Sequence, residues 1–297
     1  MLHDPISYNP FGHLDCQENP YDLRPMVRRI MEAESSILDR LPPDRQLVII
    51  MGEHHGAQGH MLLQKAVFMA HEKLRGESDA GNFAVGAEYS HDYIARYTGK
   101  EIDDPHGHEA IEVRRHYYMG CAYAAHKDVL DYCVDKKISV SFNDAACRNE
   151  IIDYNEPFTR EIVRRYSPGM LERGPVNRGG DPRGIAISNL CMVEKSIEHI
   201  NRTQARVYLH TCGQAHVLGA SDTNYPFEES LSARFLERGF EILPVICNYE
   251  MAQHYIPAEA ERLFSQSILL SHNEYGSEEI LFKDLRRAIG FQSGLDL

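Results

Sequence analysis

Five short apolar segments constrain the fold of this chain more than any other feature of its sequence. They are QLVIIM (46–51), FAVGAE (83–88), ISVSFN (138–143), ARVYLH (205–210) and FEILPVIC (240–247). Most are continuous apolar or β-branched runs, which is typical of strands that are covered on both faces. The spacing leaves room for helices between them. The pattern therefore predicts an α/β fold with a mostly parallel central sheet, helices on both faces and long loop insertions.

The segments between these strands carry helical patterns. GHMLLQKAVFMAHEKLRG (59–76) has an apolar stripe at helical spacing and ends in a glycine. Further helices are expected over 21–40, 107–137, 184–202 and 227–239. Together with the strands, they complete the alternation that the α/β prediction requires.

The remaining segments suggest one domain. Residues 1–20 read as a flexible N-terminus, and 21–297 as a single α/β domain whose tail, from about residue 256, is helical. The Gly-, Pro- and Arg-rich stretch 166–184 has no composition shift beside it, so it is expected to be a functional loop inside that domain.

Charge and cysteine content narrow the function classes. The 297 residues carry a formal net charge of −13, which argues against nucleic acid or an anionic membrane surface as partners. The seven cysteines are scattered, as expected for reduced thiols. The sequence shows no secretory signal and no apolar run near the ~20 residues of a membrane helix. A soluble, intracellular-type protein is expected.

Polar residues follow each predicted strand, and we call these segments the strand tips. The tips read GEHH, EYSHD, NDAACR, TCGQAHV and NYEMAQH in chain order. Ligands of open α/β sheets bind outside the carboxyl ends of the strands, so these tips predict an active-site cleft at that edge.

Two of the tips share a G-x-x-H motif. Gly52 and His55 follow the first strand, and Gly213 and His216 follow the fourth. A glycine at a strand end allows a tight turn and a close approach of a ligand. The repetition suggests two related halves that face one cleft.

The quoted motifs carry a family resemblance. VIIMGEHHGAQGHMLLQKA, FAVGAE and VYLHTCGQAHV resemble the erythromycin esterase/ChaN-like/TIKI superfamily over roughly residues 45–250. Within it, the chain is most similar to a branch of plant-pathogen type III secreted (Hop-type) effectors. The resemblance implies an α/β domain with a polar cleft, hydrolytic in some members and metal- or tetrapyrrole-binding in others. An effector would be delivered to the host cytoplasm.

The resemblance carries roles onto individual positions. Its first motif falls on Glu53 and His55, its second glutamate on Glu88 and its late motif on His216. The esterase branch has G-E-x-x-H, whereas this chain has Gly56 at the last position, which favours the G-E-x-H and G-x-x-H branches.

The superfamily often has an arginine before the helix predicted at 184–202. Arg183 occupies that place here and would stabilise a developing oxyanion.

The chemistry of these side chains leaves two mechanisms open. His55 or His216 activates water as a general base, while Glu53 and Glu88 set the tautomer and charge. Alternatively, His55, His216 and Glu88 hold a divalent metal (Mn, Co or Zn) or haem iron, and a metal would lower the pKa of bound water.

Other polar residues near the strand ends are candidates for substrate binding. They are Asn143, Asp144, Arg148 and His60. The first three follow the third strand and suit a carboxylate or a phosphate.

Two residues of the fourth strand are expected to be structural. His210 is predicted to be a satisfied core histidine. Cys212 is predicted to be a small buried hydrophobic residue rather than a nucleophile.

The function predicted from these residues is a hydrolase acting on a small-molecule or peptide substrate. Two alternatives remain: a haem-, iron- or metabolite-binding protein that uses the same cleft, and a non-catalytic effector recognised by a host protein.

Overall fold

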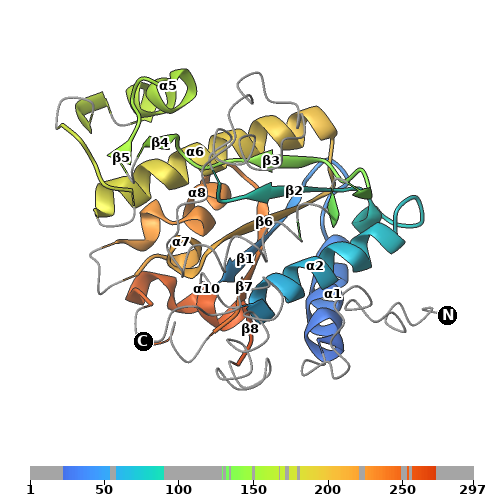
Figure 1. Cartoon of the computed structure of the whole chain (residues 1–297). Helices are drawn as coiled ribbons and strands as arrows, with labels where there is room; N and C mark the ends of the chain where they lie inside the picture. The colour runs from blue at the N-terminus through green and yellow to red at the C-terminus, as the bar shows by residue number, and fades with distance from the viewer. Residues whose placement is uncertain are drawn as a thin grey trace, which may run out of the picture.

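Figure 1 shows a computed structural model of the chain. The structure describes residues 23–53, 58–89, 129, 132–133, 135–148, 151–166, 168–170, 174–178, 181–220, 225–248, 253 and 256–271. The expectation for residues 1–20 lies outside these ranges.

A parallel sheet of six strands forms the centre, in the order β3-β2-β6-β1-β7-β8. Its strands are β1 (Leu47–Glu53), β2 (Phe83–Ala87), β3 (Val140–Phe142), β6 (Val207–Gly213), β7 (Glu241–Ile246) and β8 (Ile268–Leu269). All five predicted strands are confirmed. The sixth, β8, has only two residues and lies in the tail that was expected to be helical, because a two-residue run carries no periodicity to read.

Helices connect the strands. They are α1 (Arg24–Leu38), α2 (Gln58–Lys73), α5 (Pro157–Tyr166), α6 (Pro182–Thr203), α7 (Gln214–Leu218), α8 (Leu231–Glu237) and α10 (Glu261–Gln266). Short 3₁₀ turns occur at η1 (Asp79–Gly81), η2 (Pro168–Met170), η4 (Phe227–Glu229) and η5 (Ala258–Ala260). A small antiparallel pair, β4 (Cys147–Arg148) with β5 (Ile151–Ile152), follows β3.

The helix boundaries follow local signals. The Asp181 side chain caps α6 by accepting from the Arg183 backbone N–H at 2.9 Å, and Pro182 occupies the first turn. Helix α6 ends where Gln204 adopts the left-handed conformation. The predicted helix 107–137 lies mostly outside the described residues; positions 129, 132, 133 and 135 are helical.

Two apolar layers sandwich the sheet, which confirms the α/β fold. In Figure 1, α1 and α2 lie on one side of the strands, and α6 and α8 on the other. Alternate residues of β1 follow this division: Leu47, Ile49 and Met51 pack toward α1 and α2, whereas Val48 and Ile50 pack toward α6 and α8. We call these the α2 side and the α6 side.

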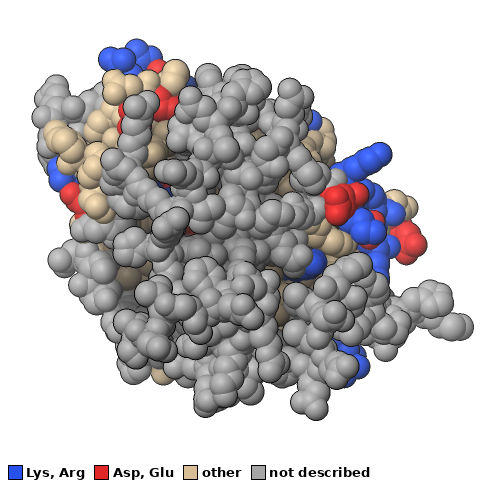
Figure 2. Space-filling view, viewed as in Figure 1, with Lys and Arg blue, Asp and Glu red and all other residues tan. Residues whose placement is uncertain are grey.

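Among the described residues, no helix is both long and apolar enough to cross a bilayer. In the space-filling view of Figure 2, the described basic side chains at the right edge stand beside acidic ones.

Candidate functional site

The strands that lead into the two G-x-x-H motifs lie side by side at the carboxyl edge of the sheet. β1 and β6 are neighbours in register, so that Gly52 lies opposite Cys212 and Glu53 opposite Gly213. A Cβ on Gly52 would lie 2.6 Å from a methyl carbon of Val217 in α7. Because Gly52 has no side chain, helix α7, which carries His216, can pack closely against β1.

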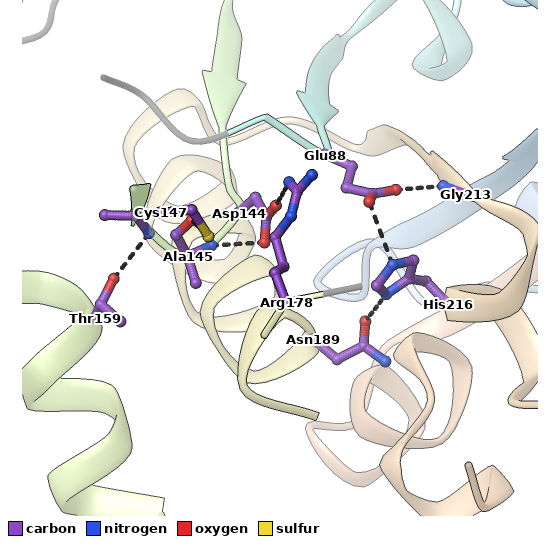
Figure 3. Close-up of polar contacts among 10 residues, drawn as sticks. Glu88, Asp144, Ala145, Cys147, Thr159, Arg178, Asn189, Gly213 and His216 are labelled. Carbon is purple, nitrogen blue, oxygen red and sulfur yellow. Dashed lines mark hydrogen bonds and ion pairs between the residues drawn. The ribbon is translucent and has the colours of Figure 1, made fainter. Parts of the chain in front are cut away.

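Glu88 and His216 form the central pair of this edge (Figure 3). Glu88 directly follows β2, and its Oε1 lies 3.3 Å from Nε2 of His216. The Gly213 backbone N–H donates to the other carboxylate oxygen, Oε2. The two side chains are only 9% and 11% exposed, so the carboxylate and the imidazole interact in a largely dry environment.

Asn189 of α6 fixes the orientation of the His216 ring. The Asn189 amide nitrogen donates to the Glu229 carbonyl at 2.9 Å and to the Tyr225 hydroxyl, so its Oδ1 faces Nδ1 of His216 at 2.6 Å. An amide oxygen only accepts hydrogen bonds, which makes Nδ1 the protonated nitrogen.

This tautomer determines what lies between His216 and Glu88. With Nδ1 protonated, Nε2 of a neutral ring would turn its lone pair toward a carboxylate oxygen, and two acceptors repel each other. A cation shared by the two atoms would relieve this repulsion. The simplest is a proton, held either as imidazolium with carboxylate or as imidazole with carboxylic acid. Such a pair can accept and deliver a proton, which is the property of a general acid–base site.

Glu53 has a different environment. Its carboxylate is buried and accepts from the Gln64 side chain of α2 at 2.5 Å. Strand alternation places it with Met51 on the α2 side, whereas Glu88 faces α6 and α7. The structure therefore brings Glu88 and His216 together and directs Glu53 to α2.

An acidic residue and an arginine lie beside this pair. Asp144 is buried just after β3; its backbone N–H donates to the carbonyl of Tyr89, the residue after Glu88. Its carboxylate binds Arg178 at 2.5 Å (Figure 3), and the Arg178 side chain is 25% exposed. Arg178 comes from the loop 166–184, which passes so close to α6 that a Cβ on Gly184 would meet the Asn177 carbonyl at 2.1 Å.

The other described residues of the predicted site have partners outside this pair or a different environment. The Arg183 guanidinium binds Asp181 in the first turn of α6, and this hydrogen bond lowers the pKa of Asp181. Arg148 belongs to the short strand β4. His60 is completely buried in α2. Asn143 is also completely buried, where it bonds to three hydroxyl groups below the edge.

The structure describes two of the three residues that were predicted to bind a metal, Glu88 and His216. His55, like His54 and Gly56, lies outside the described residues. Within the described ranges, no group of three or more His, Cys, Asp or Glu side chains could hold a metal ion. Glu88 and His216 would supply two donors, with Asn189 orienting the imidazole, whereas a catalytic zinc takes three protein ligands. A metal or haem site therefore remains a prediction that depends on His55.

The cysteine beside the second motif is a poor nucleophile. Cys212 is buried, and burial raises the pKa of its thiol well above the usual value, with Glu88 and Glu53 adding to the rise. Its side chain packs in the apolar layer of the α6 side. It was predicted to be a small buried hydrophobic residue, and its position is the expected one.

Two residues of the site were not found from the sequence. Asn189 is a polar residue inside the apolar stretch AISNLCMV, and that exception is a usable signal. Arg178 lies in a loop with several arginines, and no local pattern separates it from Arg183.

Comparison of the chain with protein-family models, curated proteins and solved structures finds no match.

Proposed function

We propose that this protein is a hydrolase and that Glu88 and His216 carry out its proton transfers. The observation that carries the proposal is the contact between Glu88 Oε1 and His216 Nε2, with Asn189 fixing the ring. The fixed ring keeps Nε2 directed at the carboxylate, which is the geometry that proton transfer between the two groups requires.

The pair can serve both halves of an acyl transfer to water. Starting from imidazolium and carboxylate, Glu88 takes a proton from water as the oxygen attacks the acyl carbon. His216 gives its proton to the leaving oxygen or nitrogen when that bond breaks. The proton on Glu88 then returns to His216, so the pair is regenerated without an external base.

Arg178 is suited to the charge that develops on the substrate. Asp144 anchors its guanidinium at the same edge, and the side chain is partly exposed. The resemblance to the erythromycin esterase/ChaN-like/TIKI superfamily would give this role to Arg183, but the Arg183 guanidinium binds Asp181 in the first turn of α6. We therefore assign the anion-stabilising role to Arg178 in place of Arg183.

A substrate panel tests the proposal. Purified wild-type protein and His216→Gln are incubated with p-nitrophenyl esters, lactones and fluorogenic peptides. We expect wild type to hydrolyse at least one class and His216→Gln to lose about 10²- to 10⁴-fold in kcat, because glutamine cannot carry the shared proton. Glu161→Gln, at an exposed ion pair of α5, is the control and retains activity.

Two outcomes would overturn the proposal. One is hydrolysis of no class by the wild type, and the other is equal turnover by wild type and His216→Gln. Metal and haem content of the wild type and of His216→Ala, from elemental analysis and absorption, tests the binding-protein alternative. Stoichiometric metal that is lost in the variant would favour a ligand role for His216.

A further inference from the structure

A buried hydrogen-bond network lies behind the catalytic edge on the α6 side. Asn143 is its centre: the amide nitrogen donates to Ser196 Oγ and to the Tyr208 hydroxyl, each at 2.9 Å, and Oδ1 accepts from Ser141 at 2.6 Å. Ser196 Oγ lies 3.4 Å from Nδ1 of His210. The network therefore runs from β3 to the middle of β6.

The directions of the hydrogen bonds in this network indicate which tautomer the His210 ring adopts. Both protons of the Asn143 amide are donated, so the Ser196 oxygen accepts and keeps its own proton. Nδ1 of His210, 3.4 Å from Ser196 Oγ, can accept that proton. A neutral ring that accepts at Nδ1 is protonated at Nε2, which becomes a donor.

His210 remains neutral under ordinary conditions. Burial lowers the pKa of His210 to about 3. The charge of Glu88 raises this pKa and that of His216 lowers it, and both effects are smaller than that of burial. A neutral imidazole donates a hydrogen bond without adding a positive charge to the site.

The free donor of His210 lies on the same side of the sheet as Glu88. His210 is opposite Gly86 in the register of β6 and β2, and a Cβ on Gly86 would lie 2.7 Å from His210 Nδ1. Glu88 follows two residues later on that side. The His210 ring is completely buried, and its Nε2 has no hydrogen-bond partner among the described residues. A buried donor of this kind needs an oxygen.

We propose that His210 is a positioning residue whose Nε2–H binds the oxygen of the water molecule that Glu88 activates. The inference rests on the proposed hydrolase function. The water accepts from His210 and donates to Glu88, which gives it the two polar partners that a buried water requires. On attack, its proton passes to Glu88 and its oxygen bonds to the acyl carbon, so His210 keeps its own proton throughout.

The first test is independent of activity. In ¹⁵N-histidine-labelled full-length protein at pH 7, we expect His210 to be protonated at Nε2 and bare at Nδ1, with a cross-peak between the Nε2 proton and a long-lived water. A ring protonated at Nδ1, or an Nε2 proton with no water cross-peak, would overturn the proposal.

Two matched substitutions test the positioning role. The Gln amide of His210→Gln reaches the position of Nε2 and can donate there. The shorter Asn amide of His210→Asn reaches only the position of Nδ1, which contacts Ser196. We expect His210→Asn to lower kcat about 10- to 100-fold with KM unchanged, and His210→Gln to restore most of that loss. Equal kcat values for two folded variants would contradict the role. If the wild type hydrolyses nothing, the proposed function fails, and the water cross-peak still decides whether the oxygen site exists.

Discussion

Glu53 and Glu88 are two glutamates that end apolar strands at one edge of one sheet, yet their partners differ. Glu53, on the α2 side, accepts from the neutral amide of Gln64. Glu88, on the α6 side, faces the imidazole of His216. An amide can stabilise a carboxylate but cannot exchange a proton with it at neutral pH, whereas an imidazole can do both. The two glutamates therefore share an edge of the sheet but differ in these contacts, and the imidazole beside Glu88 is a group that can exchange a proton with it.

The largest expected effect on stability comes from filling the space at Gly86 on the α6 side. An alanine Cβ there would lie 2.5 Å from Asn143 Nδ2 and from the Tyr208 hydroxyl. We expect Gly86→Ala to lower the free energy of unfolding by about 2–4 kcal/mol, because a buried network must shift. Gly169→Ala, where nothing lies within 4 Å of the new Cβ, is the control in urea unfolding. Equal midpoints for the two variants would contradict this packing.

His199 and His210, two buried histidines of the α6 side, make the stability of the protein depend on pH. Burial lowers the pKa of His199 to about 4 and that of His210 to about 3, from a usual value of 6.5. The unfolded chain then binds more protons than the native one, so stability is complete above pH 6.5 and decreases as the pH falls. Between pH 7 and pH 5, each histidine costs roughly 2 kcal/mol.

Urea unfolding at both pH values measures this dependence. The variants His199→Gln and His210→Gln should each show a smaller loss between pH 7 and pH 5 than the wild type. A variant with the full wild-type loss would show that its histidine is not held neutral.

The smallest effect is expected at Cys212, which packs in the apolar layer of the α6 side. Its thiol is buried, and the raised pKa keeps it protonated. We expect Cys212→Ala to change kcat by less than about threefold, since the thiol takes no part in proton transfer. Loss of turnover in a folded Cys212→Ala protein would instead indicate a nucleophilic cysteine.

Much of the fold could be predicted because short apolar runs such as LVIIM and VYLH, rich in β-branched and aromatic residues and separated by helical patterns, indicate buried strands. The pairing of Glu88 with His216 was only partly predictable. The motifs placed both at one edge, but the side that each faces depends on strand register and on the turn after Gly213. Asn189 and Arg178 reach the site through tertiary packing, and the loop that carries Arg178 is fixed by contact with Gly184, which no local pattern shows.

The most direct test of the account compares Glu88→Gln with Glu53→Gln on the ester, lactone or peptide that the wild type hydrolyses best. Both substitutions remove one carboxylate and preserve its shape. If Glu88 and His216 share the catalytic proton, Glu88→Gln lowers kcat by about 10²-fold or more, and Glu53→Gln has a much smaller effect. Equal losses in both variants, or a larger loss in Glu53→Gln, would contradict the assignment of proton transfer to the α6 side.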